Sequence, residues 1–179
     1  MIEMLRTLYG YQAWANDDLL GRLATLDPGK QAAELDTALG LIDHYHVVAR
    51  IFAGHLGGAG RQYGSDRTAE TPALKELHAA VVATDRWYQE YLQKVGLKQL
   101  SGPVAFTFTD GDKGYMTRQE MLMHVALHSA IHRGEVCRIL SQLSITPPWD
   151  TFAVYLHRAQ PSRRSQGGGQ PQGVGALPA

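Results

Sequence analysis

The sequence predicts an all-α protein: a four-helix bundle with a short hairpin or extended connection before the fourth long helix, and a short C-terminal helix. Four long segments carry apolar residues at three- and four-residue steps, which is the period of a buried helix face. Turn residues separate these segments, and one connecting stretch alternates apolar residues with others, as a strand does. With 179 residues, 44% of them hydrophobic, the chain can bury a full core in one domain.

The first helix is expected from Leu5 to the turn sequence DPGK at residues 27–30, with Gln12 as a polar break in its apolar stripe. The second helix contains LGLIDHYHVVARIFAGHL, residues 39–56, and glycines after it should end the helix. The apolar stripe expected on the second helix consists of Leu41, Val48 and Ile51, with His44 and His55 on the same side.

The third helix is expected from Leu74 to Val95, with Thr71 as its N-cap and Pro72 in its first turn. After it comes SGPVAFTFTDGDKGYMT, residues 101–117, in which apolar residues alternate before the turn sequence DGDKG. This pattern predicts a short two-stranded hairpin or an extended connection.

The fourth helix should begin after the N-cap Thr117, because Glu120 three residues later completes a capping box. It should end near Leu143, before SITPPWD, and WDTFAVYL at residues 149–156 predicts the short closing helix. We expect residues 1–158 to form the bundle domain. Residues 159–179 are rich in glycine, glutamine, proline and serine without a period, which is typical of a flexible tail.

The amino-acid composition of the chain narrows the classes of partner that it can bind. Lysine plus arginine equal aspartate plus glutamate at 17 each, so no overall basic field attracts nucleic acid. The single cysteine excludes an intramolecular disulfide, and the first residues lack the pattern of a secretory signal. No apolar run approaches the roughly 18 residues that a membrane span requires. We therefore expect a soluble, cytoplasmic protein without a nucleic-acid or membrane partner. The partner that we expect on other grounds is a small-molecule substrate or thiol.

The fourth helix contains HVALHSAIHRGEV, residues 124–136, with histidines four residues apart. Such neighbours lie about 40° apart around a helix and roughly 6 Å along it, so two imidazoles can bind one ion. Three cannot do so equally well, because His124 and His132 are about 12 Å apart along the axis. The spacing leaves both pairs open, His124 with His128 or His128 with His132. The apolar residues expected to be buried beside them are Met121, Val125, Ile131, Val136 and Ile139.

A third ligand must come from another helix. The second helix offers His44 and His55 on its expected stripe, whereas His46 is rotated about 200° from His44 and should face elsewhere. In the alternative interpretation, His44 and His128 are packed in the core and form hydrogen bonds with the backbone or with Asp43 or Glu135.

The residues around the fourth-helix histidines have simple expected roles. Cys137 lies about 140° round the helix from His132, so it should point away from an ion and pack as a small side chain. Arg133 is expected in a surface salt bridge, with a contact to an anionic thiol or carboxylate as the alternative. Glu135 is expected in solvent, with the orientation of a ligand or the role of a base as alternatives. Gly134 inside a helix costs about 1 kcal/mol relative to alanine, which suggests the close approach of another helix.

Four segments in order resemble the DinB/YfiT-like superfamily: YQAWANDDLL, LIDHYHVVARIF, HSAIHRGEV and LSQLSITPPWDTFAVYL. The resemblance covers about residues 5–158, and its most specific piece is the HxxxH followed by Arg-Gly. It implies that a histidine in the second helix and both histidines of this motif bind a divalent metal, which correspond to His44, His128 and His132. Relatives often have glutamine where this chain has Glu135.

The resemblance implies a DinB family, damage-inducible-type protein that is a homodimer. Three neutral imidazoles leave a bound ion with its full charge and open positions, and zinc, nickel, iron or manganese all suit such ligands. A metal of this kind activates water or a thiol near neutral pH. The ligands do not distinguish hydrolysis from thiol transfer, but the resemblance implies that some relatives use a low-molecular-weight thiol. The first hypothesis is therefore a metal-dependent enzyme of the thiol-dependent S-transferase type, with a pocket that has a cationic or polar rim. The alternatives are a non-catalytic metal-binding or stress-response bundle and a metal-dependent hydrolase. No catalytic residue is assigned.

Overall fold

The computed structural model describes residues 1–60, 63–107 and 111–164, and this part of the chain is mostly helical with one small sheet. Four helices are long: α1 (Ile2–Leu23), α2 (Ala32–Gly57), α3 (Leu74–Lys94) and α5 (Arg118–Gln142). The shorter elements are α4 (Leu97–Leu100), β1 (Pro103–Thr107), β2 (Lys113–Thr117), α6 (Phe152–Ala159) and the 3-10 turn η1 (Pro161–Arg163).

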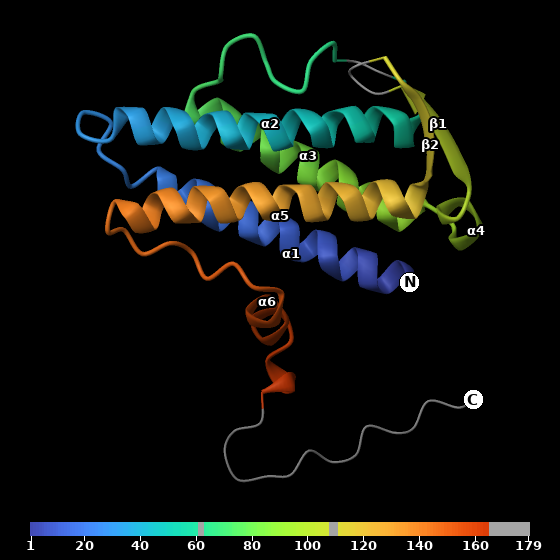
Figure 1. Cartoon of the computed structure of the whole chain (residues 1–179). Helices are drawn as coiled ribbons and strands as arrows, with labels where there is room; N and C mark the ends of the chain where they lie inside the picture. Colours follow the sequence, from blue (N-terminus) through green and yellow to red (C-terminus); the bar gives the residue numbers. More distant parts are fainter. Residues whose placement is uncertain (61–62, 108–110, 165–179) are drawn as a thin grey trace. The chain divides into compact units, whose positions relative to one another are not determined.

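The long helices lie side by side (Figure 1). Helix α2 packs against α5 and α3, and α1 packs against the same two helices. All four belong to a compact unit that ends at Pro148, and α6 and η1 belong to a second unit. The predicted domain boundary at residue 158 stays a prediction, and residues 165–179 of the expected tail lie outside the described residues.

The helix ends follow local chemistry. Thr117 Oγ1 accepts a hydrogen bond from the Glu120 amide at 3.3 Å, and the Glu120 carboxylate accepts one from the Thr117 amide at 2.7 Å, so the expected capping box of α5 is confirmed. The N-cap expected for α3 is wrong by two residues, since it is Ala73 rather than Thr71. Pro72 favours an extended residue before it, and Ala73 is itself extended, so the helix begins only at Leu74.

The predicted hairpin is confirmed by the antiparallel pairing of β1 and β2, in which Pro103 pairs with Thr117 and Thr107 with Lys113. Residues 108–110 of this predicted connection lie outside the described residues. Phe106 on β1 is buried and its ring lies 6.1 Å from the ring of Phe52 on α2. The hairpin therefore extends the core at this end of α2. The sequence did not predict α4.

The core consists of two apolar clusters. One contains Tyr9, Phe52 and Tyr88, and the other contains Leu19 and Ile42. Along each long helix, buried polar residues occupy the positions between the two clusters. This polar layer consists of Gln12 and Asn16 on α1, His46 on α2, Thr84 and Asp85 on α3, and Ser129 and Arg133 on α5.

Two predicted stripes need correction. Ile131 was expected to be buried, but its side chain is 64% exposed, because it lies on the outer side of α5. The expected stripe of α2, represented by Val48 and Ile51, is only half-buried. Helix α2 contacts both α3 and α5, so its fully buried side lies between those contacts and contains Ile42, Tyr45, Ala49, Phe52 and Leu56.

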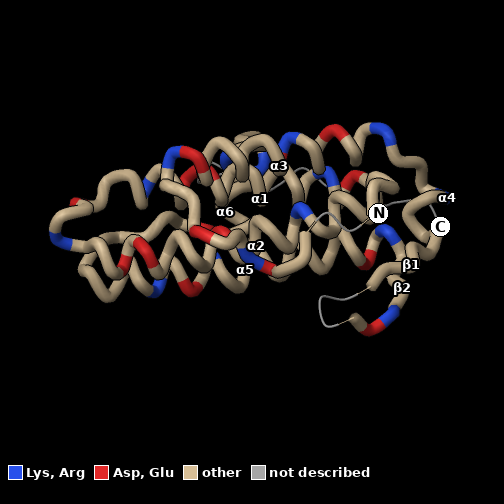
Figure 2. The backbone as a smooth tube through the Cα atoms, turned by 90° about the horizontal axis from the view of Figure 1, so that it is seen from above, with Lys and Arg blue, Asp and Glu red and all other residues tan. Residues whose placement is uncertain are grey.

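The surface charge is mixed. Basic and acidic residues alternate over the described helices, as Figure 2 shows, in keeping with a formal net charge of zero. No described helix is both long enough and apolar enough to cross a lipid bilayer.

Candidate metal centre

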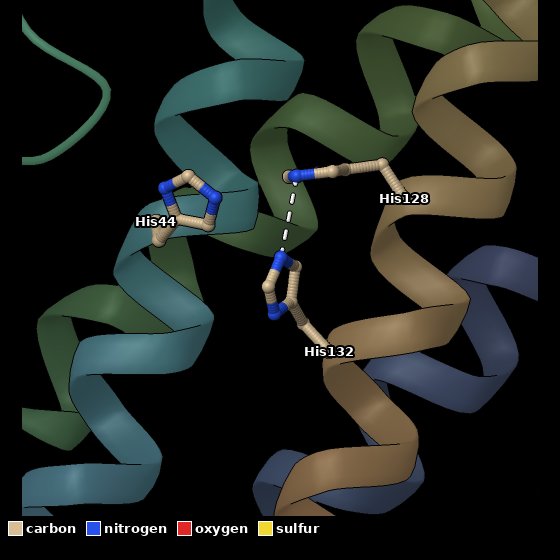
Figure 3. Close-up of side chains that lie close together, drawn as sticks. All are labelled: His44, His128 and His132. Carbon is tan, nitrogen blue, oxygen red and sulfur yellow. Dashed lines mark hydrogen bonds between the residues drawn. The ribbon is translucent and has the colours of Figure 1, made fainter.

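Helices α2 and α5 bring three histidines together. His44, His128 and His132 each offer one ring nitrogen, and these three atoms all lie within 4.8 Å of one another. The side chains of α5 point toward His44 on α2, and the Nε2 atoms of His128 and His132 are 3.2 Å apart (Figure 3). The ring of His44 lies 5.0 Å from that of His128 and 4.8 Å from that of His132.

The other histidines that the spacing left open lie beside this group. The ring of His124 stacks at 5.5 Å on His128 and lies 4.8 Å from Phe52. His55 lies 5.7 Å from the ring of Phe106. His46 faces elsewhere, as expected, because its Nε2 is 3.0 Å from the hydroxyl of Thr84 in the polar layer.

Carboxylate-bearing residues contact the outer nitrogens of two members of the group. His132 Nδ1 is 2.7 Å from the carboxylate of Glu135, and His44 Nδ1 is 3.1 Å from the backbone oxygen and 3.4 Å from the carboxylate of Asp66. A proton on each Nδ1 then leaves Nε2 with its lone pair toward the centre of the group. This arrangement is typical of metal-binding histidines. Asp66 was missed because it lies in the long connection between α2 and α3, where the sequence shows no pattern.

The surroundings of His128 and His124 favour the neutral form of these two rings. Burial, and after it the nearby His132 and His44, lower the pKa of His128 to about 4. Burial also lowers the pKa of His124. A neutral ring is the form that binds a metal, because protonation of both nitrogens removes the lone pair. The donor set therefore fits a divalent transition metal.

A pocket of about 200 Å³ adjoins the group, and His44 and His128 form part of its wall. Among the described residues that line it, none is a lysine or arginine, so of the expected cationic or polar rim only polar groups are found there. Asp66 and Thr107 supply polar groups. Its apolar and aromatic lining consists of Val48, Ile51, Phe52, His55, Phe106 and His124.

The structure overturns two expectations about the residues after His132. Arg133 was expected in a surface salt bridge, but its side chain is fully buried. It follows His132 by one residue, so it is turned about 100° further round α5 and faces α1. Its guanidinium donates hydrogen bonds to Asn16 Oδ1 at 3.3 Å and to the Tyr11 hydroxyl at 3.4 Å. At Gly134, an added Cβ would meet no atom within 4 Å, so no helix approaches closely there.

Cys137 lies where the spacing predicted. It is half-buried and packs against the second apolar cluster, away from the three histidines.

The polar layer lies behind the histidine pair of α5 and was also missed. Asp85 accepts hydrogen bonds from Asn16 Nδ2 at 2.8 Å and Gln12 Nε2 at 3.3 Å, and Tyr45 donates to Asn16 Oδ1 at 3.2 Å. Burial raises the pKa of Asp85 to about 6, although these hydrogen bonds and the charge of Arg133 lower it. The one local signal for this layer was the polar break at Gln12.

Comparison with known proteins agrees with these observations. The family model described as "DinB family" matches residues 1–166. Among curated proteins, the chain is similar to Protein DinB of Bacillus subtilis (strain 168), with 25% identity over 168 residues, covering 87% of this chain and 95% of that protein. No solved structure is matched.

Proposed function

The chain belongs to the DinB family, and from this premise we propose that it is a metal-dependent enzyme on a four-helix bundle. In this proposal His44, His128 and His132 bind one divalent transition metal ion. The observation that carries it is the convergence of three ring nitrogens from two helices within 4.8 Å of one another. The family match and the carboxylate contacts at His132 and His44 support the same assignment.

The residues around the ion would have distinct tasks. A bound divalent ion supplies a positive charge that activates a thiol or water as a nucleophile. Glu135 and Asp66 orient the rings of His132 and His44 by accepting their Nδ1 protons. Phe52 on α2 lines the adjoining pocket, where it contacts the apolar part of a substrate and excludes water.

The first reaction we propose is the transfer of a thiol sulfur to a small, largely apolar electrophile. The apolar pocket beside the histidines supports an enzyme rather than a non-catalytic metal-binding bundle, because it gives a substrate direct access to His44 and His128. Hydrolysis is the second candidate. It is favoured by the absence of lysine and arginine among the described lining residues, since an acidic thiol cofactor would gain from a cation there.

The metal proposal is tested by elemental analysis of the purified, untagged chain beside His128→Ala, both after gel filtration. We expect about one equivalent of a transition metal in the parent and its loss in the variant. His78→Ala is the matched control, because His78 lies on α3 and pairs with Asp17 rather than with the triad. No metal in the parent, even after anaerobic addition of zinc, nickel and iron(II), would contradict the proposal.

The reaction is tested with the metal-loaded chain on two chromogenic probes. A chlorodinitrobenzene with a small thiol reports S-transfer, and a nitrophenyl ester reports hydrolysis. We expect His44→Ala and His128→Ala to abolish whichever activity is present while His78→Ala keeps it. Turnover of the ester alone would favour the hydrolase.

We also propose that the chain forms a homodimer through α5. Met123, Leu127 and Ile131 recur every four residues on one side of this helix, and they are 39%, 58% and 64% exposed. A second copy that covers this apolar row would remove it from water. Light scattering tests this: Leu127→Glu should shift a dimer to a monomer, and a native monomer would contradict it.

A further inference from the structure

A second cavity lies between α2 and α3, apart from the histidine triad. This α2–α3 cleft has a volume of about 330 Å³, which is within the range of small-molecule sites. Successive residues of a helix are rotated by 100°, so Arg50 in the cleft and His44 in the triad lie about 120° apart around α2. The lining consists of Arg50, Ala53, Gly54, Gly57, Ala59, Ala83, Thr84 and Trp87.

Arg50 is the one charged side chain among the described residues that line the α2–α3 cleft. Its guanidinium lies 5.7 Å from the centre of the Tyr63 ring, a contact that holds it without neutralising it. Within the described part of the chain, no carboxylate lies at ion-pair distance from it. An arginine guanidinium in this state is suited to a carboxylate, which it can bind through two parallel hydrogen bonds.

Trp87 provides an apolar wall of the same cleft. Its ring stacks on Tyr91 at 5.3 Å and meets Tyr88 edge-on at 5.0 Å, so the indole is held from α3. A Cβ at Gly57 would lie 3.5 Å from the indole, which shows how closely the ring approaches α2. Small residues elsewhere in the lining leave the space beside the indole open.

The polar floor of the cleft brings no negative charge to compete with a ligand. The hydroxyl of Thr84 lies 3.0 Å from His46 Nε2. Burial, and after it the charge of Arg50, lower the pKa of His46 to about 4, so the ring is neutral at neutral pH and accepts a hydrogen bond from the hydroxyl. The described residues that line the cleft therefore place no negative charge beside Arg50.

We propose that the α2–α3 cleft binds a small organic anion with a planar apolar ring, the carboxylate pairing with Arg50 and the ring lying along Trp87. The simplest member of this class is an aromatic carboxylate. The site is independent of the metal chemistry proposed for the histidines, because the two groups of residues use different sides of α2.

The test is a titration of the full chain with sodium benzoate at constant ionic strength, followed by tryptophan fluorescence. Because Trp87 is in the wall, binding should change its emission and saturate. Benzamide has the same ring and no charge, so it should bind at least tenfold more weakly. Failure of benzoate to saturate the signal, or equal binding of benzamide, would overturn the proposal.

Three variants locate the site. Arg50→Gln removes the charge of a half-buried side chain, and Ala83→Leu fills the cleft from an exposed position on α3; each should weaken benzoate binding at least tenfold. His128→Ala should leave it unchanged. Circular dichroism must first show that all three are folded. Binding that survives Arg50→Gln, or that disappears in His128→Ala, would place benzoate elsewhere and refute the assignment.

Discussion

At the residue scale, two of the three triad histidines have a carboxylate-bearing partner at Nδ1. Glu135 lies 2.7 Å from His132 Nδ1, on the side away from the triad. In this position it fixes the direction of the ring and makes Nε2 a better donor to an ion. Glutamine, which resembling proteins often have at this position, keeps one oxygen that can accept the same proton.

Replacement of this partner should therefore weaken metal binding without removing it. We expect Glu135→Ala to lower the affinity for zinc by about 10- to 100-fold, and Glu135→Gln to lower it less. Competition with a chromophoric chelator measures both. Glu90→Ala is the control, because Glu90 is exposed and pairs with Lys94 on α3. An unchanged affinity in Glu135→Ala would show that the contact does not orient the ring.

The buried carboxylate of Asp85 makes stability depend on pH. Its pKa is about 6 in the folded chain and near 3.8 when unfolded, so between these values only the folded chain holds the proton. The free energy of unfolding therefore falls as pH rises through this window, by about 3 kcal/mol. His46, whose pKa is lowered to about 4, acts in the opposite direction, because its stabilising contribution is lost as pH falls.

Asp85→Asn isolates this contribution. The free energy of unfolding of the variant minus that of the native chain should rise by about 3 kcal/mol from pH 4 to pH 7. Urea denaturation at each pH measures this difference. The oxygen of the new amide can still accept the hydrogen bond from Asn16. Its NH₂ group can donate to the side-chain oxygen of Gln12, which has no hydrogen-bond partner among the described residues. Asp36→Asn, at an exposed position of α2, gives the baseline. If the free energies of unfolding of the variant and the native chain changed with pH in the same way, the prediction would be contradicted.

At the element scale, the long helices were predictable because a period of 3.6 residues is visible in the sequence. The capping box at Thr117 set the start of α5, and the glycines after α2 set its end, where Gly58 has φ 78°. Four residues are too few to show a period, so α4 was missed. The period also does not tell which side of a helix is buried when several partners surround it, and for this reason Ile131 was misplaced.

Gly134 provides a test of helix energetics in α5. It is exposed and open space surrounds it, so the backbone freedom of glycine is a cost with no packing gain. Gly134→Ala should raise the free energy of unfolding by about 0.5–1 kcal/mol, measured by urea denaturation. Gly58→Ala should have the opposite sign, because φ is positive there. A destabilised Gly134→Ala would reveal a requirement for glycine other than packing.

At the scale of the whole molecule, the candidate site depends on contacts between distant segments. The HxxxH motif could indicate the pair on α5, but Asp66 and the polar layer required the fold. Asp85 meets Asn16 across 69 residues of sequence, and no local pattern records such a pairing. Resemblance to a family, rather than spacing, singled out His44.

An ion bound between α2 and α5 should stabilise the entire fold, because it would bind the native chain and not the unfolded one. At a free zinc concentration 100 times the dissociation constant, the gain is about 2.7 kcal/mol, or a rise in Tm of about 5–10 °C for a chain of this size. Differential scanning calorimetry should show this rise in the native chain and in His78→Ala. Its persistence in His44→Ala would argue against an ion that links the two helices.

Ser129 and Arg133 each follow a triad histidine by one residue, and both side chains are fully buried about 100° further round α5. If α5 turned about its long axis, it would carry the guanidinium away from Asn16 and Tyr11 in the same movement that swung the imidazoles past His44. The buried side chains of α5 thus fix the rotation of this helix about its long axis. The direction in which the two imidazoles point is therefore determined by side chains that do not line the adjoining pocket.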